Sequence, residues 1–545
     1  MAIDRIEGFD REQSLARFRA EQFDLAIIGG GINGAAVARD AAMRGFSVAL
    51  VERGDFAGGT SSRSSKLIHG GFRYLPQGQL RLVYTALRER ELLRHRTAPH
   101  LVHPIRFLFP VYDGKGFGRF TMSMGLWLYD LFARVPRAEW HESLSAAQVR
   151  ELEPALARNG LKGGALYYDA WGDDARITLE NALDASIHGA AVANYAAVEG
   201  FTKSGGRISA AQVRDAVGGV KAELRARIFV NATGPWVDEI RRIDDPAARP
   251  CVRLTKGVHL VFPRTLLPVH DSLVLADDAG RIVFVMPHDR YVLVGTTDTD
   301  YTADAAMVGA DSTDFSYLLA VLRGSLPGIK LGDDDVASSF AGLRSLVLNG
   351  EGSRAPSAVP REEVILESAS GLLTVAGGKL TTHREIAERL VARVARALHR
   401  PTGASPTANL PLPGARAVET SGSEAEVLAA LPRAAREILV ARYGTRALLP
   451  ARITATDSAL ATPLTTGCPV LGAEVIHAVR NEMVLALADF MVRRTGLVWR
   501  WPAEAEAAAP VAARLMAREL KWDSQRHEHE IADFLADMKR RKRPA

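Results

Sequence analysis

The feature that most constrains the fold of this chain is the glycine pattern Gly29-x-Gly31-x-x-Gly34. The apolar run before it, residues 23–28, is typical of a buried strand, and residues 33–44 favour a helix. A second apolar run, residues 47–51, ends at Glu52. Strand, glycine turn, helix and strand in this order predict a βαβ unit at the entrance to a doubly wound parallel sheet.

Such a unit is a common binding site for dinucleotides. The first glycine allows a tight turn, the second lets the backbone approach a pyrophosphate, and the third permits close packing of helix on strand. The helix N-terminus offers free N–H groups to phosphates, and an acidic residue after the second strand accepts hydrogen bonds from a ribose diol. We predict a dinucleotide site formed by Gly29, Gly31, Asn33, Gly34 and Glu52, a pattern that alone does not separate FAD from NAD.

Two later segments favour a flavin. Asn231-Ala-Thr-Gly-Pro-Trp236 follows a buried strand and brings small residues and backbone toward the same cofactor. Gly377-Gly-Lys-Leu-Thr-Thr382 precedes a helix and offers a second helix N-terminus to the isoalloxazine carbonyls. The cofactor contacts expected in these two segments are Ala232, Gly234, Trp236, Gly378, Lys379, Leu380 and Thr381.

The length of 545 residues indicates more than one domain, because a single core rarely grows so large. We predict an α/β fold in which a Rossmann-type FAD-binding domain encloses an inserted, mainly antiparallel substrate domain. Strand-like runs at residues 227–231, 338–348 and 372–376 are assigned to the FAD-binding domain. That domain then comprises segments near 21–100, 176–250 and 341–400, and the substrate domain comprises segments near 101–175 and 251–340.

The remainder of the chain has a different pattern. Residues 401–422 are rich in Pro, Gly, Ser and Thr, which is typical of a linker. Residues 424–443 and 473–494 carry apolar residues at helical spacing, and no strand pattern is visible there. We therefore predict an all-helical C-terminal cap domain over residues 423–545.

Composition argues against several other classes of protein. Only Cys251 and Cys468 occur, so we expect neither a disulfide framework nor a metal site. The first 22 residues lack the apolar core of a secretory signal, which makes the cytoplasm the expected location. The net charge of +5 includes a basic tail at residues 539–543, which is either a frayed, solvated end or a site for anionic lipid. No zinc-finger spacing or RNA-binding signature points to nucleic acid.

The segment Gly58-Gly-Thr-Ser-Ser-Arg-Ser-Ser-Lys-Leu-Ile-His-Gly-Gly-Phe-Arg-Tyr74 is far more specific than a glycine turn. It resembles the flavin-linked glycerol-3-phosphate dehydrogenases of the D-amino-acid-oxidase-like superfamily. The similarity extends over nearly the whole chain, through residues 231–236, 256–259, 295–298, 341–345, 377–382 and 473–495. Two departures are visible: Ser345 follows Arg344 where the family has Arg-Pro, and His383 stands where a Tyr is common. Further cofactor contacts implied by the resemblance are Thr60, Ser61, Ser62, Ser65, Lys66 and Leu67.

The resemblance implies oxidation of sn-glycerol 3-phosphate to dihydroxyacetone phosphate, with hydride passing from C2 to N5 of FAD and electrons passing to ubiquinone or menaquinone. For the phosphate, the candidates are Arg73, Tyr74, Arg361 and Lys379, since cationic groups form strong hydrogen bonds with phosphate oxygens. Arg344 is expected to orient the substrate, with a structural ion pair as the alternative. His69 and His259 are the candidate bases, with a purely structural histidine as the alternative for each.

Competing interpretations stay open at this point. A glycerol-3-phosphate oxidase that reduces dioxygen shares the motifs, and a non-catalytic FAD-binding protein would retain the cofactor site. The short apolar stretch at residues 120–132 is either a core helix or a segment that dips into a membrane interface. The family implies peripheral attachment to the inner face of the cytoplasmic membrane. A homodimer is the oligomeric state that we consider for this chain.

Overall fold

The computed structural model describes residues 9–75, 78–114, 119–277, 279–348, 363–417 and 422–543. The glycine pattern follows strand β1 (Gln22–Ile28) and runs into the first turn of helix α2 (Ile32–Met43), so strand, glycine turn and helix occur in the predicted order. Strand β1 pairs in parallel with β2 (Val48–Val51) and with β10 (Lys221–Asn231). Parallel pairing continues from β2 to β7 (Ala191–Ala193) and from β10 to β18 (Leu372–Ala376). The antiparallel strand β17 (Val364–Glu367) closes one edge of this doubly wound sheet.

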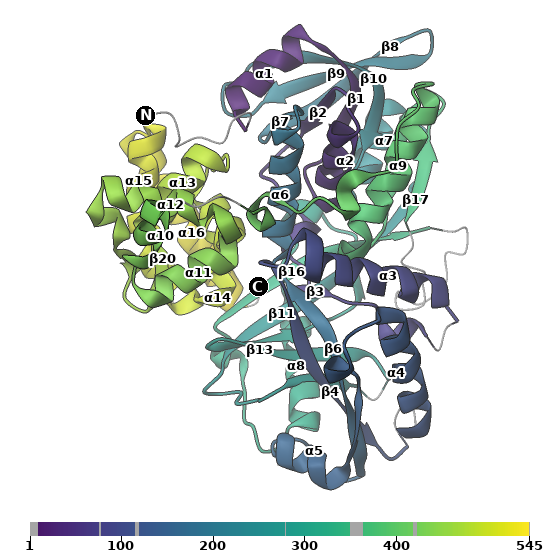
Figure 1. Cartoon of the computed structure of the whole chain (residues 1–545), viewed down its shortest axis with the longest axis vertical. Helices are drawn as coiled ribbons and strands as arrows, with labels where there is room; N and C mark the ends of the chain where they lie inside the picture. Colours follow the sequence, from purple (N-terminus) through teal and green to yellow (C-terminus); the bar gives the residue numbers. More distant parts are fainter. Residues whose placement is uncertain are drawn as a thin grey trace.

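Helices cover both faces of the first sheet (Figure 1). Helix α2 packs with α6 (Asp174–Ile187) and α9 (His383–Ala397) on one face, around an apolar core rich in Ala, Val and Leu. The other face packs on α1 (Arg11–Ala20), on α7 (Val237–Asp244) and on the hairpin of β8 (Ala196–Ser204) and β9 (Arg207–Asp215). Because both faces are buried, β1 is apolar at consecutive positions instead of alternating.

The second sheet is mainly antiparallel, as predicted. Its strand order runs from β15 (Thr299–Asp300) through β11 (Val252–Pro263), β14 (Tyr291–Gly295), β13 (Ile282–His288), β12 (Ser272–Ala276), β4 (Val102–Tyr112) and β6 (Leu161–Gly172) to β3 (Leu67–Ile68). Strand β5 (Glu142–Ser145) extends it beside β6. Among the strands of this sheet that the structure describes, β12 and β4 form the one parallel pair. Helix α8 (Ser312–Ser325) packs on one face of this sheet, which leaves the other face for the candidate site.

One strand lies in a different sheet from the one we predicted. Strand β16 (Ser338–Val347) was assigned to the FAD-binding domain, but it pairs antiparallel with β11 in the second sheet, from Val252 opposite Val347 to Val261 opposite Ser338. The assignment was wrong because a fully buried strand reads as the same apolar run in either sheet. Its C-terminal end nevertheless leads back toward the first sheet, since β17 and β18 follow in the chain.

The C-terminal cap is helical with one short exception. Its helices are α10 (Gly422–Ala429), α11 (Arg433–Tyr443), α12 (Leu448–Thr456), α13 (Gly472–Asn481), α14 (Leu497–Arg500), α15 (Pro502–Leu520) and α16 (Ser524–Lys542). The helical stretch expected at residues 424–443 is divided before Pro432, whose ring cannot continue a helix. A two-stranded hairpin of β19 (Pro463–Thr465) and β20 (Cys468–Leu471) corrects the expectation that this region contains no strand.

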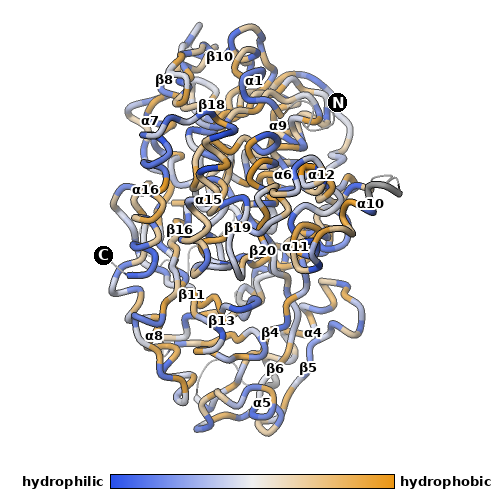
Figure 2. Tube along the Cα trace, turned by 90° about the vertical axis from the view of Figure 1, so that its left-hand side faces the viewer, coloured by the Kyte–Doolittle hydropathy of each residue, from blue (hydrophilic) through white to orange (hydrophobic). Residues whose placement is uncertain are grey.

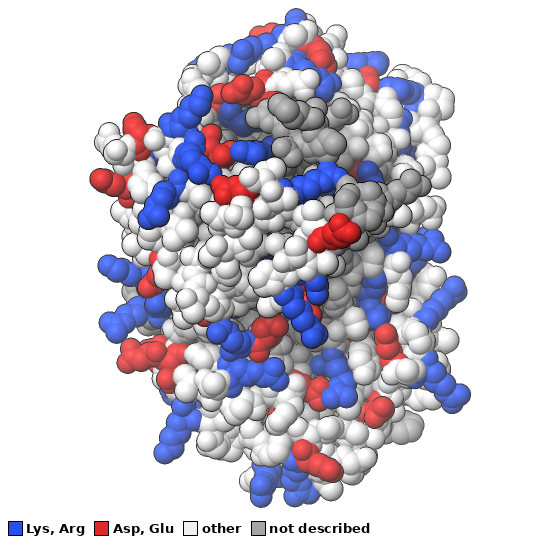
Figure 3. All heavy atoms as spheres, turned by 60° about the vertical axis from the view of Figure 1, so that its left-hand side comes forward, with Lys and Arg blue, Asp and Glu red and all other residues white. Residues whose placement is uncertain are grey.

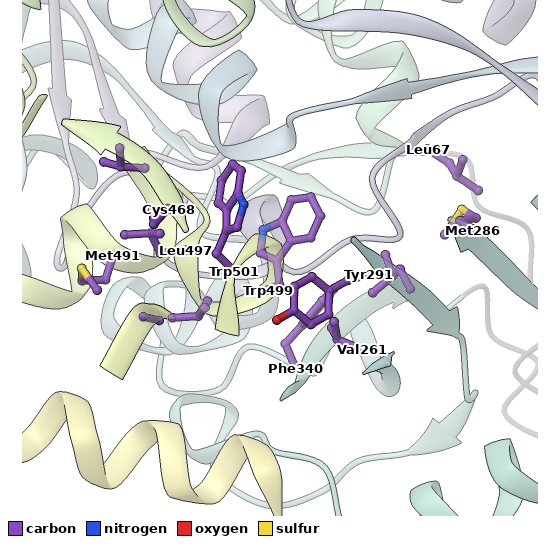
Figure 4. Packing of buried hydrophobic residues seen from close by; sticks show 14 of the residues in the cluster. Leu67, Val261, Met286, Tyr291, Phe340, Cys468, Met491, Leu497, Trp499 and Trp501 are labelled. Atoms are coloured by element: carbon purple, nitrogen blue, oxygen red, sulfur yellow. The ribbon is translucent and has the colours of Figure 1, made fainter. Parts of the chain in front are cut away.

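The cap packs against the second sheet and against the helix α6 that covers the first sheet. In Figure 2 it faces the viewer, and its elements contact β16 of the second sheet and α6 beside the first. Figure 4 shows Trp499 and Trp501 of the cap meeting Phe340 and Tyr291 of the second sheet in one apolar cluster. Buried ion pairs add directional contacts. The two Nη atoms of Arg494 donate to the two carboxylate oxygens of Asp55 at 2.7 and 2.8 Å, and Arg176 of α6 pairs with Glu482 at 2.8 Å. The segment that we expected to be a linker contacts α6, because the Gly414 N–H donates to the Glu180 carboxylate at 3.0 Å.

The basic tail is not a frayed end, which corrects one of our two interpretations. Helix α16 continues through Lys542 because Met538 is fully buried and Arg541 donates to the Ser339 carbonyl at 3.3 Å. Lys542 pairs with Glu506 at 2.8 Å. Figure 3, which shows the face that carries the cap, displays basic and acidic side chains interspersed over the surface. Among the described residues, the tail cations Lys539, Arg540 and Arg543 stay exposed.

Candidate active site

A cavity of about 860 Å³ lies between the two sheets and is lined by residues from both. The cofactor residues predicted from sequence that line it are Gly29, Gly31, Asn33, Glu52, Thr60, Ser61, Ser65, Leu67, Ala232, Gly234, Trp236, Gly378, Lys379, Leu380 and Thr381. His69, His259 and Arg344 line the same cavity. Segments that are more than 300 residues apart in the chain, such as residues 29–34 and 377–381, thus share one site.

Glycines make the cradle at the ends of the parallel strands. Gly29 has φ +109°, which favours glycine, and a Cβ there would lie 2.7 Å from the carbonyl oxygen of Ala232. A Cβ at Gly34 would overlap the Gly29 carbonyl oxygen. Gly34 therefore packs against the turn and is not among the residues that line the cavity. The turn therefore leaves room for a pyrophosphate beside the N-terminus of α2.

Backbone contacts hold the acidic residue and the adjoining loops in place. Glu52 accepts hydrogen bonds from Gly30 N–H at 2.6 Å and Gly54 N–H at 2.9 Å, which hold its carboxylate at the cavity wall. Burial raises the Glu52 pKa, and these two N–H groups oppose the shift by stabilising the charged form. Asn33 donates to the Gly377 carbonyl at 3.3 Å and so ties α2 to the loop before α9.

Residues 58–67 run from the first sheet to the second and carry the cofactor-facing hydroxyls. Ser61 accepts a hydrogen bond from Ile32 N–H at 2.9 Å, and Thr60 donates to the Leu343 carbonyl at 2.6 Å. Lys66 differs from the expectation because it is buried behind the loop, where it pairs with Asp174 at 2.6 Å and donates to the Ser62 carbonyl. Neither Lys66 nor Ser62 lines the cavity, so they shape the loop from behind.

Arg344 is held at the cavity wall on β16. Its guanidinium donates to the Thr297 carbonyl at 3.2 Å, to Asp298 at 3.1 Å and to the Thr296 hydroxyl at 3.1 Å. The ion pair that we considered as an alternative therefore exists, yet the arginine also lines the cavity. A guanidinium fixed in this way is a preorganised positive charge for a substrate oxygen.

His259 lies on β11 and is fully enclosed. Its Nε2 is 2.8 Å from the Ser65 hydroxyl, and its ring stacks on Phe340 with centroids 4.8 Å apart. Burial, with help from the Arg344 and Lys66 charges, lowers the pKa of His259 to about 3. The imidazole is therefore neutral at physiological pH and is bound to Ser65 of the loop formed by residues 58–67, called the cofactor loop below.

The turn formed by residues 69–74 carries the other candidate groups. His69 lines the cavity, whereas Tyr74 is buried and is not part of the cavity wall. His69 N–H donates to the Thr381 hydroxyl at 3.2 Å, which joins the turn to the loop before α9. Lys379 Nζ lies 4.1 Å from the centroid of the Tyr74 ring, a cation–π contact. Arg73 belongs to the same turn, η2 (Phe72–Tyr74), but its side chain lies outside the described part of the chain, as does all of Arg361.

Sequence reasoning missed several residues of this site. Asp169 and Tyr167 of β6 and Asp298 line the cavity, and Tyr129 of α4 (Arg119–Ala133) lies directly behind it. A signal for Asp169 was present, since a charged residue inside an apolar strand run is costly unless it has a partner or a function. Nothing in the sequence connected it with residues 69–74, because the pairing of β6 with β3 makes that connection.

A glycine cradle at the ends of parallel strands, facing a polar sheet across one cavity, defines an FAD-dependent oxidoreductase. Residues 24–384 match the family described as FAD dependent oxidoreductase, and residues 405–527 match the C-terminal domain of alpha-glycerophosphate oxidase. The cradle glycines, Glu52 and the cavity volume fit FAD as the cofactor.

Similar proteins narrow the family. The aerobic glycerol-3-phosphate dehydrogenase of Staphylococcus saprophyticus is 37% identical over 505 residues, covering 90% of this chain and 89% of that protein. The enzyme of the same name from Bacillus subtilis is 34% identical over 554 residues, covering 98% of this chain and 99% of that protein. The crystal structure of glycerol-3-phosphate dehydrogenase from Bacillus halodurans complexed with FAD has a TM-score of 0.78 at 30% identity, covering 98% of each chain. This chain belongs to the family of flavin-linked glycerol-3-phosphate dehydrogenases.

Proposed function

We propose that this protein oxidises sn-glycerol 3-phosphate to dihydroxyacetone phosphate and passes the electrons to a membrane quinone. The observation that carries the substrate is the cationic pair Lys379 and Arg344 at one cavity beside the FAD cradle. Two fixed cations suit a phosphate dianion and an alcohol oxygen better than an uncharged polyol. The names of the similar proteins point to the same substrate.

FAD, when bound, supplies the electron sink that takes a hydride from C2 of the substrate. Lys379 holds the phosphate from the cavity wall. The resemblance keeps Arg73, Tyr74 and Arg361 as further candidates for the phosphate. Arg344 orients the alcohol oxygen and stabilises negative charge that develops on it. His259 holds the cofactor loop through Ser65 at 2.8 Å. His69 lines the cavity and is one candidate for the base.

The substrate assignment is tested by anaerobic titration of the purified yellow protein. Glycerol 3-phosphate should bleach the flavin absorbance, and unphosphorylated glycerol should do so poorly because it lacks the anionic group that Lys379 binds. Equal bleaching by both alcohols would refute the phosphate anchor. No bleaching by either would favour a non-catalytic FAD-binding protein.

The electron acceptor separates the dehydrogenase from the oxidase. Substrate-driven reduction of a soluble quinone analogue is measured against peroxide formation in air. A quinone-linked enzyme should pass most reducing equivalents to the analogue. If peroxide accounts for nearly all of them while the quinone stays oxidised, the protein is a glycerol-3-phosphate oxidase and the quinone assignment is withdrawn.

Two exposed helix faces support peripheral attachment to the inner face of the cytoplasmic membrane. Helix α4 buries Met122, Leu126 and Tyr129 but exposes Met124, Trp127 and Leu131 by 61%, 55% and 62%. The neighbouring α3 (Leu80–Leu92) exposes Leu80 and Tyr84. Exposed arginines flank this apolar patch, namely Arg81, Arg88, Arg134 and Arg137. Apolar side chains with a basic rim are typical of a helix that lies in a membrane interface. No described helix is both long and apolar enough to cross a bilayer.

Liposome sedimentation distinguishes this patch from the tail. Trp127→Ser with Leu131→Ser should weaken binding to anionic liposomes at every salt concentration. Lys539→Gln with Arg540→Gln should weaken it only at low salt, because exposed charges are screened beyond about 8 Å at physiological ionic strength. Val440→Ser, at an exposed apolar position of the cap, is the matched control. Unchanged binding of the α4 variant would exclude this surface.

A further inference from the structure

A buried carboxylate of β6 is anchored beside the turn of residues 69–74. Asp169 Oδ1 accepts hydrogen bonds from Tyr129 OH at 2.7 Å, from Arg90 Nη1 at 2.8 Å and from Gly70 N–H at 3.3 Å. Tyr129 OH in turn accepts from the same Gly70 N–H at 2.9 Å. Helices α3 and α4 therefore meet the strand at one carboxylate oxygen, which fixes the position of the side chain.

The second oxygen of Asp169 is differently placed. All the hydrogen bonds of this carboxylate within the described part of the chain end on Oδ1, so Oδ2 is left without a protein partner there. Asp169 is 3% exposed and lines the cavity that also holds His69, Lys379 and Arg344. An oxygen of a cavity-lining carboxylate that has no protein donor can accept a hydrogen bond from a bound ligand.

We propose that Asp169 is a catalytic residue whose Oδ2 accepts the hydroxyl hydrogen bond of the bound alcohol and takes its proton during oxidation. The proposal rests on the proposed substrate and cofactor. The step balances: the O–H bond at C2 breaks and its proton forms a new bond to Oδ2, while the C2 hydride and its two electrons leave to FAD. The products are the ketone, the reduced cofactor and a protonated Asp169.

The surroundings suit a group that gains and loses one proton. The charged and titratable groups that face Asp169 are Arg90 from α3, Tyr129 from α4 and Tyr167 from β6 itself. Burial raises the pKa of Asp169, and Arg90 and Tyr129 moderate the rise by stabilising the carboxylate. When Asp169 carries the proton, Arg90 keeps an ionic partner in Glu91 at 2.7 Å. His259 is less suited as the base, because its Nε2 is engaged with the Ser65 hydroxyl.

Asp169→Asn tests the proton transfer without removing the anchor. The amide oxygen can still accept from Tyr129, Arg90 and Gly70, but the NH₂ group toward the cavity cannot take a proton. We expect normal FAD content and flavin bleaching by glycerol 3-phosphate that is slower by about 10²- to 10⁴-fold. In the unaltered protein, the bleaching rate should fall as pH drops through a pKa above the ordinary carboxyl value of about 3.9. This fall is the acidic limb of the pH profile, and Asp169→Asn should lose it.

A second variant keeps the carboxylate and changes only its environment. Tyr129→Phe removes a donor that stabilises the charged form, so the pKa of Asp169 rises and the acidic limb should move to higher pH. A purely structural tyrosine would not shift this limb. Tyr112→Phe is the matched control, because its hydroxyl donates to the Ala157 carbonyl at 3.0 Å and Tyr112 is not part of the cavity wall.

The outcomes separate this assignment from the proposed function. If glycerol 3-phosphate does not bleach the unaltered protein, the proposed function fails and the assignment fails with it. If the unaltered protein is bleached and Asp169→Asn reacts within about threefold of it, or keeps the same pH limb, only the assignment is overturned and His69 becomes the base. If Asp169→Asn loses FAD, Tyr129→Phe becomes the test. An acidic limb of its pH profile that lies at the same pH as in the unaltered protein then overturns the assignment.

Discussion

The two halves of the cavity are built by different means. The cofactor half consists of turns at the ends of neighbouring strands β1, β10 and β18, and its walls are largely glycine and backbone. The substrate half consists of side chains carried on β6, β11 and β16 and on the loop before α9. A large cofactor that stays bound is held by shape and backbone N–H groups, whereas a small substrate must be held by a few fixed charges.

This difference predicts different responses to substitution. A change in the cofactor half should act through space and remove FAD together with every later step. A change in the substrate half should leave FAD in place and slow one step. The predictions below test that separation, beginning with the change that should affect the most steps.

The first prediction concerns Gly34→Ala in the cradle. A methyl group there would overlap the Gly29 carbonyl oxygen, so the turn or α2 must shift. Overpacking of this kind costs about 1–3 kcal/mol even after relaxation, or roughly 5- to 150-fold in affinity for FAD. The ratio of flavin to protein absorbance after dialysis should drop accordingly. Gly324→Ala in α8, where nothing lies within 4 Å of the added carbon, should retain the yellow colour.

The second prediction concerns Arg344→Ala in the substrate half. Loss of one preorganised charge at a developing anion slows the chemical step by about 10²- to 10³-fold. FAD content should stay normal, because this side chain is fixed by Thr296, Thr297 and Asp298 rather than by the cradle. Stopped-flow bleaching by glycerol 3-phosphate measures the effect, with Arg323→Ala on α8 as the control. A parallel loss of FAD would show that the two halves are not separable.

The same difference explains what the sequence could predict. The cofactor half lies in short contiguous segments, and most of the residues expected there line the cavity. Lys66 is an exception, because its positive φ of 59° and its pairing with Asp174 turn the side chain away from the cavity. Asp174 lies 108 residues further along the chain, so no local pattern could reveal the pairing.

The substrate half depends on strand pairing, which one sequence does not specify. His259 and Arg344 were found only through the family resemblance, and Asp169 was missed. Strand β16 was placed in the wrong sheet because its apolar run fits either one. For α4 the core interpretation is confirmed on the inner face, which packs, while the outer face stays exposed and the membrane interpretation stays a prediction.

The smallest predicted effect concerns acid stability and His383, where the family commonly has a tyrosine. His383 is buried on the cofactor side, and its Nδ1 is 2.7 Å from the Leu380 carbonyl. Burial lowers its pKa to about 4, whereas an unfolded histidine titrates near 6.5. Between these values the unfolded chain binds a proton that the folded protein does not. Stability from this residue is therefore complete above about pH 6.5 and is lost as pH falls, by about 1.4 kcal/mol per pH unit at most.

His383→Tyr should make the decline in stability between about pH 6 and pH 4 shallower by that amount, whatever its effect at neutral pH. His259 remains in the variant and should still contribute its own decline, because its folded pKa is about 3. Urea unfolding followed at several pH values gives the slope, and His529→Tyr on the exposed side of α16 controls for the substitution itself. An unchanged slope in His383→Tyr would mean that this histidine is protonated in the folded protein, with its Nδ1–H bond to Leu380 outweighing burial.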